Sequence, residues 1–320
     1  MIIGDGDKKE YFVTYLDESF LLQGMSLHES LKRWLPEVVL YVICLDRRAA
    51  DVLSRLAIPD MNPIYLGDVE TEALLSVKCT RSRIEYIYTL TPFTFDFVGK
   101  ANPDVARITY VDADIYFFSS PIPLYDELLK SRKSILMTEH GYAPEYRHLQ
   151  NSAGRFCVQF LPVDWSNKGK EVVRYWQKKC LEGTGVSSKH GAKVFGDQKY
   201  LEDWPEIFPN SVHVSVQNSE MLAPWNVNYF NSRNGKLINP IFFHFHSFRF
   251  LPLSLVQYAA GYNISTALPL YKEYVASLKR QLNILKENGE DLPVIQLNDR
   301  YWLLRLLWRS FRRRVVIAKF

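Results

Sequence analysis

The stretch Ile108-Thr-Tyr-Val-Asp-Ala-Asp114 places two carboxylates directly after a short apolar run. If that run is a strand, its extended backbone directs alternate side chains to one face, so Asp112 and Asp114 can converge on one ligand. Such an oxygen-rich site suits Mn²⁺ or Mg²⁺. Exposed acidic pairs are usually only solvated, but a pair on a buried edge needs a cation or a cage of hydrogen bonds. The stretch therefore predicts a metal site, with a solvated pair as the alternative.

The first half of the chain alternates between strand-like and helix-like segments. Strands are expected at Tyr11–Leu16, Val38–Cys44, Ile64–Leu66 and Ile108–Val111, and a helix is expected over Leu27–Leu35. This order predicts an α/β fold with an open, mostly parallel sheet and helices on both faces. Ligands bind such sheets at the carboxyl ends of the strands, where Asp112 and Asp114 would lie.

The second half of the chain is less regular. Strands are expected at Phe156–Val163 and Ile241–Ser247, and a helix over Lys170–Leu181. Apolar residues at helical spacing from Tyr271 to Leu285 predict an amphipathic helix, which Asn288-Gly289 ends. We therefore expect one domain over residues 1–265, with halves at about 1–120 and 121–265, and a helical extension over residues 266–320.

Two histidines follow in the run Phe242-Phe-His-Phe-His246. In a strand, His244 and His246 would share one face while the phenylalanines occupy the other. Either imidazole could complete an Asp, Asp, His metal site. The alternative is that both are core histidines or support the metal ligands from behind.

Three further pairs of residues are candidates for ligand binding: Asp197-Gln198, Trp225-Asn226, and Arg81 with Arg83. Asp197 and Gln198 open a helix-like segment and could hydrogen-bond sugar hydroxyls, but Asp is also among the best N-cap residues. Trp225 could stack on a sugar or belong to the core. The two guanidinium groups could pair with phosphate oxygens or lie free on the surface.

The composition limits the class of protein. Apolar residues make up 47% and charged residues 23%, which is typical of a globular chain. The four cysteines, Cys44, Cys79, Cys157 and Cys180, show no paired short spacing, so we expect buried, reduced thiols in a cytosolic protein. Neither a signal peptide nor an apolar run of ~20 residues is expected.

The positive charge is concentrated at one end of the chain. Residues 298–320 hold seven basic side chains and one acid, so no general affinity for nucleic acid is expected. From Tyr301 to Val315 the apolar and basic residues separate onto two arcs of a helix, which predicts attachment to an anionic membrane surface through residues 300–316. A helix packed on the domain with a solvated basic face is the alternative.

These landmarks together resemble the bacterial GT-A glycosyltransferases related to glycosyltransferase family 8. The resemblance extends over roughly residues 11–250. Its landmarks are Thr14-Tyr-Leu-Asp17, Arg83-Ile-Glu-Tyr86, Tyr110-Val-Asp-Ala-Asp114, Gly154-Arg-Phe-Cys-Val-Gln159, Gly196-Asp-Gln-Lys-Tyr-Leu201, Ala223-Pro-Trp-Asn226 and Phe243-His-Phe-His246.

The resemblance implies a GT-A, Rossmann-like fold and a metal-dependent, retaining transfer of a hexosyl group from a nucleotide sugar, usually a UDP-sugar. The first half of the domain would bind the donor and the second half a saccharide or lipid-linked acceptor, in cell-surface polysaccharide assembly at the inner face of the bacterial plasma membrane. Asp197 and Gln198 would lie near the reacting carbon of the donor sugar. Contacts to the donor would come from Thr14, Tyr15, Asp17, Arg81, Arg83, Asp112, Ala113 and Asp114, and further substrate contacts from Gln159, Trp225, Asn226 and Arg249.

The chain departs from family 8 after the late histidines. It reads His244-Phe-His-Ser-Phe-Arg249 and lacks the Gly, Lys and Pro-Trp of that family, so Arg249 is expected to replace the lysine. Two alternatives remain: a non-catalytic sugar- or lipid-binding protein with this fold, and a haloacid dehalogenase-type phosphatase. The phosphatase pattern calls for Thr or Val where this chain has Tyr116. A glycoside hydrolase is excluded, because its two carboxylates must lie ~5–9.5 Å apart across a bond.

Overall fold

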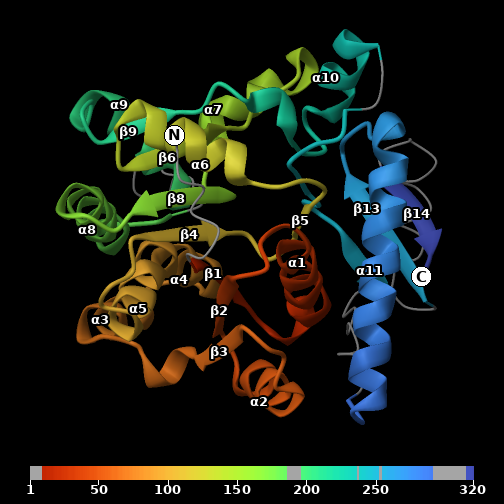
Figure 1. The fold of residues 1–320 in the computed structure, drawn as a ribbon, viewed down its shortest axis with the longest axis horizontal. Coiled ribbons are helices and arrows are strands. Elements are labelled where there is room, and N and C mark those ends of the chain that lie inside the picture. Colours follow the sequence, from red (N-terminus) through yellow and green to blue (C-terminus); the bar gives the residue numbers. More distant parts are fainter. Residues whose placement is uncertain (1–8, 186–195, 236–237, 252–253, 291–314) are drawn as a thin grey trace.

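A computed structural model describes residues 9–185, 196–235, 238–251, 254–290 and 315–320 (Figure 1). Its main sheet has the strand order β3-β2-β1-β4-β8-β6-β7, and β9 pairs with β6. Strands β3, β2, β1 and β4 are parallel, whereas β8 is antiparallel to β4 and to β6. The strands are β1 (Glu10–Leu16), β2 (Val38–Cys44), β3 (Met61–Tyr65), β4 (Arg107–Val111), β6 (Ile135–Glu139), β7 (Phe156–Cys157), β8 (Phe160–Asp164) and β9 (Val212–Val214).

Helices cover both faces of this sheet, because its strands are apolar on both sides. Phe12 and Val13 are neighbours in β1 and are fully buried, yet they belong to two different cores. The core around Phe12 takes side chains from α1, α2 and α6, and the core around Val13 from α3, α4, α5, α8 and α9. The helices are α1 (Leu21–Trp34), α2 (Arg47–Leu56), α3 (Glu72–Lys78), α4 (Arg83–Leu90), α5 (Thr94–Ala101), α6 (Ile122–Ser131), α7 (Gln150–Ala153), α8 (Asn167–Glu182), α9 (Trp204–Ile207), α10 (Val227–Asn234) and α11 (Leu268–Glu287).

A small second sheet lies beyond the end of β4. It has the order β10-β11-β5, with β5 at Ile115–Phe117, β10 at Met221–Leu222 and β11 at Phe242–His244. Strand β11 runs antiparallel to β5 and pairs His244 with Ile115. A segment far along the chain is thereby brought next to the two aspartates that follow β4.

The C-terminal region contains the expected long helix, α11, which packs along α1 (Figure 1). Glu29 of α1 accepts hydrogen bonds from the side chains of Ser277, Arg280 and Gln281 on α11. The predicted helical extension is thus present. The predicted basic helix over Tyr301–Val315 falls outside the described residues, except for its last position.

The region is not helical to its end. Val315–Lys319 forms strand β14, which pairs antiparallel with β13 (Leu255–Ala260), and β12 (Arg249–Leu251) completes a third sheet. Three consecutive β-branched residues, Val315-Val-Ile317, favour this extended conformation over the predicted helix end.

Two predicted strands are shorter than expected. Phe156–Val163 is divided into β7 and β8, because the chain passes from pairing with β6 to pairing with β4. β11 ends at His244 and not at Ser247. After it, Phe245 N–H bonds the Asp114 carbonyl at 2.9 Å, and a turn places Ser247 at φ +65°.

The thiols are free, as expected, but Cys79 is exposed, because it caps the end of the short helix α3. Within the described part of the chain, no helix combines the length and apolar character that crossing a bilayer requires.

Candidate active site

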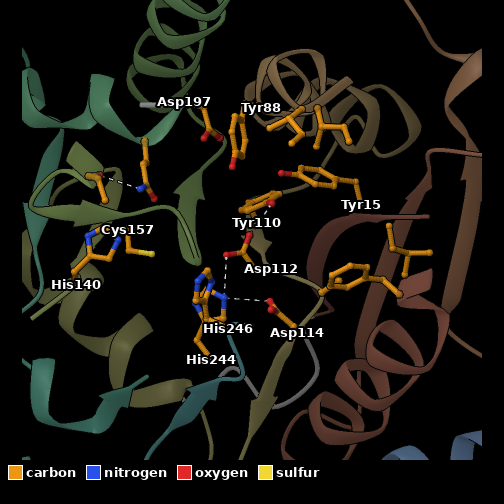
Figure 2. Close-up of a pocket in the computed structure, with 18 of the residues that line it drawn as sticks. Tyr15, Tyr88, Tyr110, Asp112, Asp114, His140, Cys157, Asp197, His244 and His246 are labelled. Carbon is orange, nitrogen blue, oxygen red and sulfur yellow. Dashed lines mark hydrogen bonds and ion pairs between the residues drawn. The ribbon is translucent and has the colours of Figure 1, made fainter. Parts of the chain in front are cut away.

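Asp112, Asp114 and His244 form a cluster at the carboxyl end of β4 (Figure 2). The Nε2 atom of His244 lies 3.1 Å from Asp114 Oδ1 and 3.8 Å from Asp112 Oδ2. One ligand atom from each residue lies within 4.8 Å of the others. Two carboxylate oxygens and one imidazole nitrogen are a suitable donor set for Mn²⁺ or Mg²⁺. The three residues therefore fit a divalent cation.

Burial and mutual charge perturb all three groups. Burial raises the pKa of Asp112 above its usual value, and the neighbouring Asp114 adds to this. Burial also opposes ionisation of Asp114, but the charge of His244 outweighs it and lowers the pKa of that carboxyl. Burial disfavours the His244 cation, yet Asp114 and Asp112 raise its pKa well above the usual value. Without a metal, a proton on His244 balances the carboxylates, and a cation would take over that role.

His246 does not belong to this cluster. It lies beyond the end of β11, where the strand alternation that would have aligned it with His244 has ceased. Its ring packs edge-on against Trp225 at 5.6 Å between centroids, and burial lowers its pKa to about 4. Among the described residues, the metal-binding geometry thus favours His244, and His246 lines the adjoining cavity as a neutral side chain.

A cavity of about 630 Å³ opens above the cluster, within the size range of small-molecule sites. It brings together most of the predicted site residues. Those that line it are Tyr15, Asp17, Asp112, Ala113, Asp114, Asp197, Gln198, Trp225, His244, His246 and Arg249.

Asp197 projects into the cavity beside Tyr88 (Figure 2). It precedes the 3-10 helix Gln198–Asp203, but its side chain makes no capping hydrogen bond, which argues against the N-cap alternative. Burial raises the pKa of Asp197 to about 7, and the charge of Asp112 adds to the effect. Gln198 donates from Nε2 to the carbonyl of Ala153 at 2.9 Å.

Neither of the two predicted arginines is among the residues that line the cavity. Arg81 donates to the backbone carbonyls of Cys180 and Leu181 and does not line the cavity, so the structure does not support its predicted phosphate contact. Arg83 pairs at 2.8 Å with Asp17, which lines the cavity, and the Arg83 side chain itself is two-thirds exposed. The two lie two residues apart, but Ser82 caps helix α4 between them, and only Arg83 enters that helix.

Three more predicted contacts are buried behind the cavity wall. Thr14 is fully buried within β1, because the side chain that follows it, Tyr15, takes the cavity face. Asn226 bonds the backbone at Ala223 and His140 and so shapes the loop around Trp225. Gln159 accepts a hydrogen bond from His244 instead of facing the cavity, so it is not placed to touch substrate.

Sequence reasoning missed several cavity residues. Tyr110 donates from its hydroxyl to Asp112 Oδ1 at 2.9 Å, and the two-residue spacing along β4 could have indicated this. Tyr88 lies on α4 about one helical turn after Glu85, just outside the Arg83-Ile-Glu-Tyr86 landmark. Tyr142, Cys157 and Tyr262 also line the cavity, but they come from loops and strand ends without a local signal.

No family model matches the chain. Two uncharacterized proteins of Bacillus subtilis (strain 168) are similar to it in sequence. YfnD is 28% identical over 291 residues, covering 88% of this chain and 92% of its own length. YfnF is 27% identical over 258 residues, covering 77% of this chain and 84% of its own length.

Solved glycosyltransferases share the fold. The galactosyltransferase LgtC, in complex with donor and acceptor sugar analogs, superposes with a TM-score of 0.53 at 12% identity over 85% of this chain and 96% of that chain. The bifunctional glycosyltransferase WbbM, in its apo structure, superposes with a TM-score of 0.51 at 12% identity, over 88% of this chain and 52% of that chain. The predicted fold class is confirmed: the chain has a GT-A fold, which leaves no support for the haloacid dehalogenase alternative.

Proposed function

We propose that this protein is a metal-dependent glycosyltransferase that moves a hexosyl group from a UDP-sugar to a saccharide or lipid-linked acceptor. The observation that carries the proposal is the Asp112, Asp114 and His244 cluster beneath a cavity at the carboxyl edge of a GT-A sheet. In open α/β sheets this edge is where ligands bind.

The residues around the cavity have distinct proposed roles. Asp112, Asp114 and His244 would hold Mn²⁺ or Mg²⁺, which when bound neutralises charge growing on the departing diphosphate. Tyr15 and Asp17 lie at the end of β1, where the nucleoside would rest, and the Arg249 guanidinium is available for a phosphate oxygen.

The reacting sugar would lie between the cluster and Asp197. The carboxylate of Asp197 would stabilise positive charge that develops on the sugar ring, and the amide of Gln198 would orient a hydroxyl group. We propose retention of configuration, with the acceptor entering on the side of the cavity that Trp225 lines. Trp225 is 4% exposed and its ring packs on His140 and His244, so it would contact the acceptor through the edge that reaches the cavity. The resemblance to family 8 supports this stereochemistry.

The proposal predicts donor binding that needs a metal. Screening UDP-sugars by thermal shift should give one sugar that raises the melting temperature with Mn²⁺ but not with EDTA, because ligands that bind only the folded state stabilise it. Incubation of that UDP-sugar with Mn²⁺ and the protein should then release UDP slowly by hydrolysis. Binding without any release or transfer would identify a non-catalytic sugar-binding protein, and no metal-dependent shift with any nucleotide sugar would contradict the proposal.

We also propose attachment to the cytoplasmic face of the plasma membrane through residues 300–316, where lipid-linked acceptors for cell-surface polysaccharides would be presented. Its support is the clustered basic charge of the sequence, since residues 300–314 lie outside those that the structure describes. Each basic side chain near anionic lipid contributes about 1 kcal/mol.

Sedimentation with vesicles should test this attachment. Phosphatidylglycerol vesicles should retain the protein at low salt, whereas phosphatidylcholine vesicles should not. The combined change Arg305→Glu, Arg309→Glu and Arg312→Glu should reduce retention at least tenfold. Equal recovery of the original protein with both kinds of vesicle would contradict the proposal.

A further inference from the structure

His244 is held from behind by a buried side chain. The Oε1 atom of Gln159 lies 2.9 Å from His244 Nδ1, on the side of the ring opposite the two aspartates. Gln159 is 1% exposed and His244 6% exposed, so water does not compete for this contact. The backbone carbonyl of Gln159 also accepts from Asp112 N–H at 3.0 Å. One residue in the β7–β8 connection therefore touches two of the three members of the cluster.

The chemistry of this contact defines which nitrogen is available for a cation. An amide oxygen only accepts hydrogen bonds, so Nδ1 of His244 must carry the hydrogen. In a neutral ring the lone pair is then on Nε2, the atom that lies 3.1 Å from Asp114 Oδ1. The thiol of Cys157 also contacts His244, but sulfur is a weaker acceptor than an amide oxygen.

The choice of a neutral partner also matters. Metal-bound histidines commonly donate their second N–H to a carboxylate or carbonyl group, and a carboxylate here would add a third negative charge to a buried site. An amide orients the ring without that charge. Gln159 is thus suited to orient His244 and unsuited to touch the substrate, since it does not line the cavity.

We infer that Gln159 is a positioning residue of the metal site, which holds His244 with Nε2 directed at the cation between Asp112 and Asp114. The inference rests on the metal site of the proposed function but not on the identity of the donor or acceptor. Partners of this kind contribute about 10–100-fold to metal affinity.

The test measures Mn²⁺ affinity by titration calorimetry in the presence of UDP. Gln159→Leu removes the acceptor while nearly preserving the volume, and should weaken Mn²⁺ binding about 10–100-fold. Gln159→Glu keeps an acceptor for Nδ1 and should restore most of the affinity. Gln177→Leu removes another buried glutamine, which donates to Pro92 and Asp96 and neither lines the cavity nor contacts the cluster, and it should leave Mn²⁺ affinity within about twofold of the original.

A second readout separates orientation from general damage. Nitrogen NMR of the histidine side chains with bound Mg²⁺ should show Nδ1 of His244 protonated in the original protein, and a mixture of tautomers in Gln159→Leu. Unchanged Mn²⁺ affinity in a folded Gln159→Leu variant would overturn the inference alone. An original protein that binds no Mn²⁺, with or without UDP, would overturn the metal site and this inference together.

Discussion

Replacing Asp114 by Asn should abolish Mn²⁺ binding at micromolar concentrations and reduce glycosyl transfer by about a thousandfold or more. Asp114 Oδ1 is the carboxylate oxygen nearest to His244 Nε2, so it lies where a shared cation must sit. An amide oxygen is uncharged and binds a hard cation far less well than a carboxylate. Loss of one group that stabilises transition-state charge typically costs 10²–10³ in rate, and here the whole cation would be lost with it.

The measurement is calorimetric titration of Mn²⁺ in the presence of UDP, followed by a transfer assay. Asp51→Asn changes an exposed aspartate on α2 and is the matched control, which should behave as the original protein does. Unchanged Mn²⁺ affinity in Asp114→Asn would remove Asp114 from the metal site and would require a different role for the cluster.

Replacing Asp197 by Asn should stabilise the metal-free protein and impair transfer at the same time. The pKa of Asp197 is raised to about 7, chiefly by burial. The titratable side chains that interact with its charge are Asp112, Tyr15, Tyr88, Tyr110 and Cys180. Below the ordinary pKa of an aspartate the folded and unfolded states hold the same proton, so folding has no cost from this group. As the pH rises toward 7, the unfolded chain ionises freely while the folded protein must keep the proton.

The stabilisation by Asp197→Asn should therefore grow with pH and level off above about pH 7. One pH unit between the two pKa values corresponds to about 1.4 kcal/mol, so the gain in unfolding free energy should be roughly 3 kcal/mol larger at pH 8 than at pH 5. Urea unfolding in EDTA at both pH values measures this gain. Asp203→Asn, in the 3-10 helix that follows Asp197, changes an exposed carboxylate and should show no such pH dependence.

The effect on transfer has the opposite sign. Asn cannot stabilise positive charge on the sugar as a carboxylate does, so the rate should fall by about 10²–10³ while Mn²⁺ affinity stays within a few fold. A gain in stability that does not depend on pH would show that Asp197 ionises normally in the folded protein. Full activity in Asp197→Asn would exclude a role in the reaction.

Such a gain in stability on removal of a charged group is typical of sites that are arranged for function and not for folding. The two predictions are also independent of each other. Mn²⁺ affinity should depend on Asp114 and not on Asp197, so the two variants separate metal binding from the chemistry at the other end of the cavity.

Local pattern in the sequence was sufficient for the fold class and for one part of the site. Apolar runs of strand length that alternate with helical periodicity specify a mostly parallel sheet, because each run must bury both faces. The position of Asp112 and Asp114 directly after such a run places them at the ligand-binding edge. These features depend on neighbours within a few residues, and they could be predicted for that reason.

The remainder depended on contacts between distant segments. The antiparallel pairing of β11 with β5 places His244 beside the two aspartates. His246 is not placed there, because the strand ends at His244. The sequence could not show that Arg81 and Arg83 differ in their contacts, because both are arginines. Arg81 donates to backbone carbonyls at the end of α8, a contact that only the folded structure creates.

The sequence by itself determined the α/β class, the parallel strands of the first half and the acidic pair, because strand and helix periodicities are local. Only the tertiary structure decided which imidazole joins that pair and that Gln159 supports it from behind the cavity. It also decided that Asp197 is buried enough to hold a proton near pH 7. These properties depend on what packs around each side chain, and the packing brings together segments 85 or more residues apart.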